Sequence, residues 1–488
     1  MAKVTAVIDI GSNSARMVVF EKTSRFGFHM LNETKSKVRI SENAYQNGGN
    51  LQKYAMQRAL DALENFLSIA KSYKARKILC VATSALRDAP NKTVFLQLVR
   101  AKLGINIKII SGEKEAFFGG IAVANLLPPQ ESALSVDIGG GSTEFCSIAQ
   151  QNTSLPFSLD LGAVRLKELF FDKGDIDGAK AYIQHTLKQL PYKQNIQTLI
   201  GIGGSFRSLA LAVMKMQNYP LKKIHAYELK AQKLKKLLKH ILSADTKELK
   251  KLHIKEDRFD VIKPGALILL EIIKQFRVEH IIISGVGVRE GVYLSDILRN
   301  ANYRFPANYN PSVGYLMDTH IYNKKHSNLL AKVTKEIFEL TRTDLSLPLK
   351  YKTALVIAAK LYPIGGSIHY YSKNKHSYYI IQAVLEYGFS HKETMLIATL
   401  NRYAKRKLPS KEHYEKYKEL LPQKELLEKL SFILSIAVAL LTHKPDRKDF
   451  QLSYKKNVLH VETNHSMRVS KEAVEKLDFI QTLRVAFE

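Results

Sequence analysis

Short apolar runs alternate with amphipathic stretches through the first 300 residues of the chain. An apolar run bounded by glycine or polar residues is typical of a strand, and apolar positions at helical spacing are typical of a helix. The pattern predicts strands near residues 4–10, 16–21, 26–33, 77–82 and 105–110, helices over 51–73 and 92–103, and a further helix that opens after Ser111.

The same scheme repeats after Pro128 and Pro129, which break the preceding helix. It predicts strands near 133–138, 143–148, 155–160, 199–202 and 279–285, a lysine-rich helical stretch over 228–251 and a helix over 267–276. Alternating strands and helices predict an α/β fold with two similar halves, residues 1–127 and 128–300. The lysines of 228–251 are interleaved with leucines, which favours a solvated helix face over a dedicated phosphate track.

Glycines become rarer after residue 300, and helical periodicity dominates from 327 to 441. This change predicts a separate all-helical domain over 301–445. The last segment, 446–488, has alternating runs at 450–454 and 458–462 followed by a helical pattern, so we expect a small α/β appendage there.

Two glycine-rich loops follow apolar strands at equivalent places in the two halves. They read Asp-Ile-Gly-Ser-Asn-Ser from Asp9 and Asp-Ile-Gly-Gly-Gly-Ser-Thr-Glu from Asp137. Glycine allows tight turns and close approach to a ligand, and successive backbone N–H groups bind anions. We therefore expect the two loops to face each other across a cleft and to hold phosphate groups through Gly11, Ser12, Asn13 and Ser14 and through Gly139, Gly140, Gly141, Ser142 and Thr143.

Composition narrows the class of protein. The net charge of +29 is spread along the chain and favours polyanionic partners, although a general lysine bias would produce the same number. Two cysteines in 488 residues fit a reducing compartment, and the apolar run 432–441 is too short to span a membrane. The N-terminus lacks the organisation of a signal peptide. We expect a cytoplasmic protein without a membrane anchor.

Six motifs together resemble one family. They are the two glycine loops, Ala82-Thr83-Ser84-Ala85-Leu86-Arg87-Asp88-Ala89, Ser111-Gly112-x-x-Glu115-Ala116, Gly201-x-Gly203-Gly204-Ser205 and Ser284-Gly285-x-Gly287-Val288-Arg289-Glu290-Gly291. In this order and spacing they resemble the exopolyphosphatase/guanosine pentaphosphate phosphohydrolase (Ppx/GppA) family of the actin-like ATPase superfamily. The resemblance covers about residues 1–300. It implies two RNase-H-like lobes around an active site, and polyphosphate or guanosine pentaphosphate and tetraphosphate as ligands, with a link to the stringent response.

Hydrolysis of a phosphoanhydride requires charge neutralisation and an oriented water. Asp137 and Glu144 offer the oxygen ligands that Mg²⁺ prefers. Glu115 begins a helix where it can face the cleft and act as general base, and the family's catalytic glutamate falls on it. Glu113, two positions earlier, would point elsewhere on the helix. Arg87 is a candidate fork for a phosphate group.

Each of these residues also has a structural interpretation. Glu115 alone would be read as a charge that stabilises a helix N-terminus, and Glu144 alone as a surface strand residue. Arg87 could instead pair with Asp88 or Glu113, and Arg289 is better read as an ordinary ion pair. The two glycine loops are what shift the interpretation of Glu115 towards catalysis.

Residues 355–377 resemble the HD-type phosphohydrolase fold that this family carries behind its catalytic lobes. The positions comparable to the metal-binding His-Asp pair read Leu361-Tyr362-Pro363, so His369 and His376 lack the ligands for such a site. We expect this domain to be a scaffold for binding, regulation or dimerisation, and the protein to be a homodimer.

The alternatives belong to other functional classes. A sugar or acetate-type kinase of the same superfamily would use an acceptor-activating aspartate, whereas Glu115 follows a Ser-Gly turn that resembles the hydrolase. A non-catalytic sensor of an alarmone nucleotide would be expected to lack Glu115 or the loop aspartates, and all are present. Nucleic-acid binding is not expected, because no recognisable module and no basic–aromatic platform occur.

Overall fold

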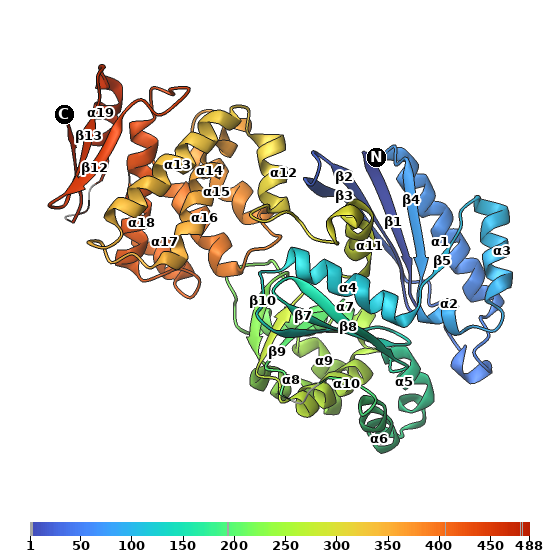
Figure 1. Ribbon diagram of the computed structural model, residues 1–488. Coiled ribbons are helices and arrows are strands. Elements are labelled where there is room, and N and C mark those ends of the chain that lie inside the picture. The colour runs from blue at the N-terminus through green and yellow to red at the C-terminus, as the bar shows by residue number, and fades with distance from the viewer. Residues whose placement is uncertain (1–2, 193–194, 406, 479, 481) are drawn as a thin grey trace. The chain divides into compact units, whose positions relative to one another are not determined.

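The computed structural model describes residues 3–192, 195–405, 407–478, 480 and 482–488. The chain divides into two compact units, Met1–Asn308 and Tyr309–Glu488. The first contains two α/β lobes and the second is mainly helical (Figure 1). The sequence pattern places the change of character at residue 301, shortly before the end of the first unit.

The first lobe is built on a sheet with strand order β3-β2-β1-β4-β5. Strand β1 pairs with β2 in antiparallel and with β4 in parallel orientation, so the chain makes a hairpin meander before it crosses over. Its elements are β1 (Val4–Ile10), β2 (Ala15–Lys22), β3 (Phe28–Ser36), α1 (Lys53–Ser72), β4 (Lys77–Ala82), α2 (Ser84–Asp88), α3 (Lys92–Leu103), β5 (Lys108–Ile109) and α4 (Gly112–Leu126).

The second lobe repeats this plan in a sheet with order β10-β11-β9-β6-β7-β8. Strand β6 again pairs with an antiparallel hairpin partner, β7, and a parallel neighbour, β9. The predicted fold class, two similar α/β lobes followed by a helical domain, is confirmed. The elements are β6 (Ala133–Ile138), β7 (Thr143–Ala149), β8 (Asn152–Leu159), α5 (Ala163–Leu169), α6 (Ile176–Leu187), β9 (Thr198–Ile202), α7 (Gly203–Met216), β10 (Tyr227–Lys230), α8 (Ala231–Ser243), α9 (Thr246–Lys251), α10 (Ile262–Phe276), β11 (His280–Ile283) and α11 (Val288–Ile297).

Two helices cross between the lobes. Helix α4 packs on the β7–β8 side of the second sheet, and α11 packs on α4 and on β1 of the first sheet (Figure 1). Tyr293 of α11 stacks on Phe20 of β2 with ring centroids 4.4 Å apart. At the crossing, a Cβ atom on Gly291 would lie 1.9 Å from the carbonyl oxygen of Phe118, so only glycine allows this approach. The packing of α4 and α11 at this crossing holds the two lobes against each other.

Two predicted elements differ from those observed. The stretch 228–251 is not one helix, because Tyr227–Lys230 forms the edge strand β10 and Asp245 starts a new helix with a capping box. Tyr227 and Leu229 alternate towards the core with period two, which is strand geometry. The predicted strand 105–110 shrinks to Lys108–Ile109, since only these residues pair with β4.

The second unit contains helices followed by a small sheet. The helices are α12 (Pro311–His320), α13 (Lys324–Thr341), α14 (Lys352–Leu361), α15 (Lys373–Val384), α16 (His391–Tyr403), α17 (Lys411–Tyr417) and α18 (Lys424–Leu440). They are followed by β12 (Gln451–Lys455), β13 (Val458–Glu462), α19 (Arg468–Glu475) and β14 (Arg484–Phe487). The sequence pattern missed β14, which is short and gains its place by parallel pairing with β13.

Two further observations concern the cysteines and the length of the apolar helices. Cys80 and Cys146 are buried free thiols. In the described part of the chain, no helix combines the length and the apolar character needed to cross a bilayer.

Candidate active site

The β1–β2 and β6–β7 hairpins are built alike. In each turn, the first glycine donates a backbone hydrogen bond to a serine carbonyl, Gly11 to Ser14 at 3.2 Å and Gly139 to Ser142 at 3.0 Å. The strand registers also correspond, with Asp9 opposite Arg16 in the first hairpin and Asp137 opposite Glu144 in the second. The two hairpins thus carry an aspartate at the same place and residues of opposite charge across from it.

The two loops face each other, as the sequence predicts. A Cβ atom on Gly140 would lie 2.8 Å from the Cβ of Ser12, so glycine is needed for this approach. The loops border an open cleft whose empty space, counted together with the adjoining solvent, is about 960 Å³. Of the predicted site residues, the cleft is lined by Gly11, Ser12, Asn13, Ser14, Glu115, Asp137, Gly139, Gly140, Ser142 and Glu144.

Three predicted phosphate ligands do not line this cleft. Thr143 is fully buried and its hydroxyl donates to the carbonyl of Leu161. Gly141 lies against Tyr45 and Ser84. Arg87 donates to the carboxylate of Glu115 at 3.2 Å and pairs with Asp88 at 3.7 Å, the second contact being the one that its structural interpretation predicts.

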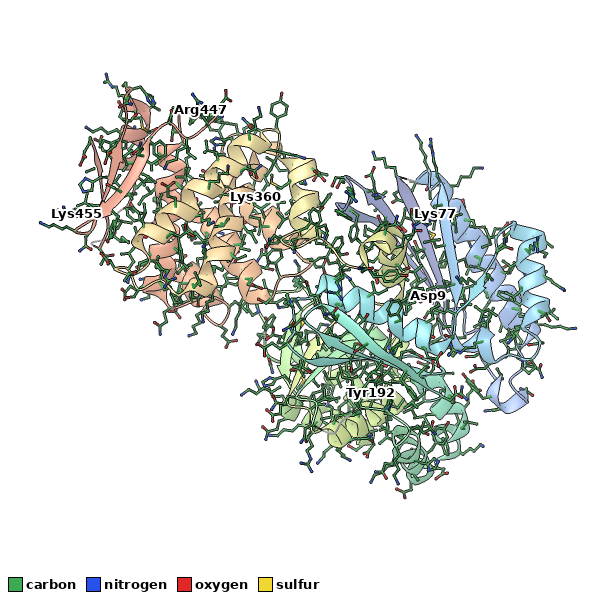
Figure 2. All side chains as sticks on the ribbon, viewed as in Figure 1. Asp9, Lys77, Tyr192, Lys360, Arg447 and Lys455 are labelled. Atoms are coloured by element: carbon green, nitrogen blue, oxygen red, sulfur yellow. The ribbon has the colours of Figure 1, made fainter. Side chains whose placement is uncertain are left out.

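Carboxylates gather at the second loop. Burial raises the pKa of Asp137 to about 6, an effect that Arg207 partly opposes. Burial, reinforced by Asp137, raises the pKa of Glu144 to about 8, although Ser158 donates a hydrogen bond to Glu144 at 3.0 Å. Burial likewise raises the pKa of Asp9, which lies next to the last residue of β1 (Figure 2). Buried acidic groups of this kind either hold protons or share a cation.

Glu115 enters the cleft from the first turn of α4. The hydroxyl of Ser111 caps this helix by accepting from the backbone N–H of Lys114 at 3.2 Å. The Glu115 residue is only 8% exposed, whereas Glu113 points to solvent, as expected. Burial and the neighbouring Glu144 raise the pKa of Glu115 well above its ordinary value, and the guanidinium of Arg87 opposes this shift.

Sequence reasoning missed most of the arginines that line the cleft. Arg16, Arg207 and Arg258 join Arg289 there. Burial, with the neighbouring charges of Arg289 and Arg16, lowers the pKa of Arg207 to about 10. A cluster of four guanidinium groups in one cleft indicates a binding site for anionic oxygen atoms.

All four arginines have further contacts. Arg16 lies 3.6 Å from Glu33, and Arg207 donates to the carbonyl of Ser284 at 3.2 Å. Arg289 does pair with Glu33, at 2.7 Å, as its structural interpretation predicts, but it also borders the cleft. Arg258 donates to Ser205 at 3.2 Å, and its Nε atom is buried without a hydrogen-bond partner. The only available sequence signal was position, since Arg16 and Arg207 each follow a glycine turn within a few residues.

The donor set fits a hard divalent cation beside a phosphate chain. Asp9, Asp137 and Glu144 supply acidic oxygen atoms that ionise more readily around a cation. The loop N–H groups and the arginines supply donors for phosphate oxygens. Glu115 then offers a carboxylate that can take a proton from a water molecule in the same cleft.

The sequence of this chain is similar to those of known phosphatases. Residues 18–300 match the Ppx/GppA phosphatase family, and residues 310–483 match domain III of Ppx/GppA phosphatases. A guanosine-5'-triphosphate,3'-diphosphate pyrophosphatase of Vibrio vulnificus is 29% identical over 81% of this chain and 80% of that protein. A bifunctional 3-dehydroquinate synthase/phosphatase of Fusobacterium nucleatum is 33% identical over 57% of this chain. The match spans less than half of that relative, 44% of its length.

Solved structures agree on the fold. The crystal structure of the Aquifex aeolicus member of the Ppx/GppA family is 26% identical, with a TM-score of 0.53, and covers 62% of this chain and 99% of that one. An exopolyphosphatase from Cytophaga hutchinsonii shares the fold, at 24% identity and a TM-score of 0.56, over 60% of this chain and 97% of that one. With the family match extending over more than half of its length, the chain belongs to the Ppx/GppA phosphatase family.

Proposed function

We propose that this protein is a Mg²⁺-dependent phosphoanhydride hydrolase. It releases the terminal phosphate of inorganic polyphosphate, the 5'-terminal phosphate of guanosine pentaphosphate, or both, and action on the nucleotide would link it to the stringent response. The observation that carries this proposal is the position of Glu115, a buried carboxylate in the same cleft as both glycine loops.

The chain's own residues account for the reaction as follows. The loop N–H groups and the arginines hold the phosphate oxygens and align the terminal group. In its ionised form, Glu115 accepts a proton from water as the water oxygen bonds to phosphorus and the anhydride bond breaks. Mg²⁺, held by Asp137 and Glu144 with Asp9 nearby, would neutralise charge on the substrate.

The decisive experiment measures phosphate release from long-chain polyphosphate and from guanosine pentaphosphate, side by side, in the presence of Mg²⁺. Glu115→Gln should lower kcat by about 10² to 10⁴ with little change in KM, because the base acts on water and not on bound phosphate. Glu113→Gln is the matched control, since it removes the exposed carboxylate from the same helical turn. It should leave both constants unchanged.

Other outcomes would redirect the assignment. Near-full turnover by Glu115→Gln would show that another group is the base. Nucleotide binding without release from either substrate would favour the sensor, and transfer of phosphate to an acceptor other than water would favour the kinase. The ratio of the two release rates identifies the preferred substrate.

A further inference from the structure

Three side chains in the second unit converge where its helices meet the small sheet. His443 follows α18, Asp449 precedes β12, and His465 lies between β13 and α19. One ligand atom of each lies within 4.8 Å of the others. Arg447 marks the loop that carries Asp449 (Figure 2). Segments separated in sequence thus bring together two imidazoles and a carboxylate, which is a donor set typical of zinc.

Hydrogen bonds around His443 define which nitrogen is available. Its Nδ1 atom lies 3.0 Å from the hydroxyl of Ser470, and that hydroxyl donates to the carbonyl of Leu440 at 2.9 Å. Because the hydroxyl has one proton, it accepts from Nδ1–H. In neutral His443 the Nε2 atom therefore carries a lone pair. A partner that accepts a hydrogen bond from the N–H opposite the ligating nitrogen is typical of metal-binding histidines.

Asp449 is the centre of the cluster. Its Oδ2 atom lies 2.8 Å from Nε2 of His443 and 3.0 Å from Nε2 of His465. The second imidazole is positioned by Thr463, whose hydroxyl lies 3.0 Å from Nδ1 of His465. The other carboxylate oxygen, Oδ1, is buried without a hydrogen-bond partner. With Nε2 unprotonated, its lone pair faces a carboxylate oxygen, and a cation held by both atoms would take the place of the proton that otherwise joins them.

We propose that His443, Asp449 and His465 bind a divalent metal ion of the zinc class. Zinc bonds to histidine nitrogen and carboxylate oxygen are about 2.0–2.2 Å long, so small rearrangements of the three side chains would accommodate the ion. Since the ligands come from both sides of the junction, the ion would fasten β12, β13 and α19 to the end of α18. Metal binding would then contribute to the folding stability of this unit.

This site is distinct from the degenerate HD position. His369 is exposed and its Nδ1 atom accepts from the backbone of Tyr371. Within the described residues, neither His369 nor His376 belongs to a group of three potential metal ligands. The sequence offered no spacing signal for the new cluster, because its members are joined only by the packing of the sheet on α18.

The test uses the full-length protein, stripped with a chelator and titrated with Zn²⁺ in equilibrium dialysis. One Zn²⁺ should bind per chain to this site, and His465→Ala and Asp449→Asn should each lose that equivalent. His369→Ala is the matched control, an exposed histidine of the same unit, and should retain it. Ser470→Ala should weaken binding by about 10- to 100-fold, because it removes the group that orients His443.

Co²⁺ in place of Zn²⁺ gives a second readout that does not depend on phosphatase activity. Co²⁺ bound by histidine nitrogens at a low coordination number should give visible absorption bands, and His465→Ala should abolish them. Co²⁺ at an all-oxygen site in the other unit should not give these bands. Zn²⁺ should raise the melting temperature of wild type and His369→Ala more than that of His465→Ala. Equal Zn²⁺ stoichiometry and equal melting shifts in wild type and His465→Ala would overturn the proposal.

Discussion

Arg87 and Glu115 form a contact that is more informative than either residue alone. The guanidinium also donates to the carbonyl of Ile110, just before the helix that carries Glu115. Arg87 therefore holds the carboxylate in place and favours its charged form, while burial and Glu144 favour the protonated form. This balance makes Arg87 a positioning residue that acts through the proposed base.

Arg87→Met should consequently change the pH dependence of catalysis. Loss of the guanidinium raises the pKa of Glu115 further, so the acidic limb of the pH profile of kcat/KM should move to higher pH. The measurement is a full pH profile for wild type, Arg87→Met and the charge-conserving Arg87→Lys, which should shift less. An equal loss of rate at every pH would indicate a phosphate contact or a purely structural role instead.

The clustered carboxylates should also couple stability to pH and Mg²⁺. Because the folded pKa of Asp137 is about 6 and that of Glu144 about 8, both raised, the folded state favours their protonated forms. Their stabilising contribution is complete below their ordinary pKa values and is lost as pH rises through 6 to 8. Bound Mg²⁺ should offset this loss, since it requires the ionised carboxylates.

We therefore expect Mg²⁺ to raise the melting temperature more at pH 8.5 than at pH 5.5, as measured by scanning calorimetry against a chelator-treated control. In the double variant Asp137→Asn/Glu144→Gln, the effect of Mg²⁺ on the melting temperature should be the same at both pH values. The same Mg²⁺ effect at both pH values would argue against these residues as ligands.

At the scale of elements, the geometry of the site depends on the position in which α4 packs between the two lobes. This helix brings Glu115 from the first lobe onto the sheet of the second, and α11 crosses it at Gly291. A side chain at that crossing would separate the helices and displace Glu115 from the loops. The close contact fixes where α4 places the backbone of Glu115, and Arg87 then holds its carboxylate.

Gly291→Ala should therefore destabilise the protein by about 3 kcal/mol, because the new methyl group would overlap a backbone carbonyl that cannot move freely. The same variant should lower kcat by a larger factor than the factor by which it changes KM. Gly119→Ala on α4 is the control, since its Cβ would meet the side chain of Ile202 at an ordinary 3.5 Å. It should be neutral or stabilising in urea denaturation. Equal stability of the two variants would contradict this role of the crossing.

The elements also show where sequence reasoning succeeds. Both hairpins and the helix start at Ser111 were predicted because glycine turns, apolar strands and helix caps are local features. Glu115 became a candidate base only through the two glycine loops and the family resemblance. Arg207 and Arg258 were missed because their importance comes from tertiary packing, which brings α7 and the segment before α10 to the cleft. Edge elements such as β10 and β14 were missed or misread because pairing, and not intrinsic pattern, decides their state.

At the scale of the whole molecule, the net charge of +29 should act on substrate capture. A long polyanion samples the field of many lysines and arginines before it enters the cleft, and salt screens that field over about 8 Å at physiological ionic strength. We expect kcat/KM for polyphosphate to fall with added KCl at constant Mg²⁺, and more steeply for long chains than for short ones. Steady-state kinetics across a salt series would check this, and a slope independent of chain length would contradict it.

The paired hairpins have one more consequence. Where the second hairpin places Glu144 opposite its aspartate, the first places Arg16, so a duplicated scaffold carries unlike charges at matching positions. Linear polyphosphate is chemically the same read from either end. A cleft with equivalent walls would accept such a polymer in both directions, whereas unlike charges at these positions would favour one of them. For polyphosphate as the proposed substrate, this difference would contribute a direction that the polymer itself lacks.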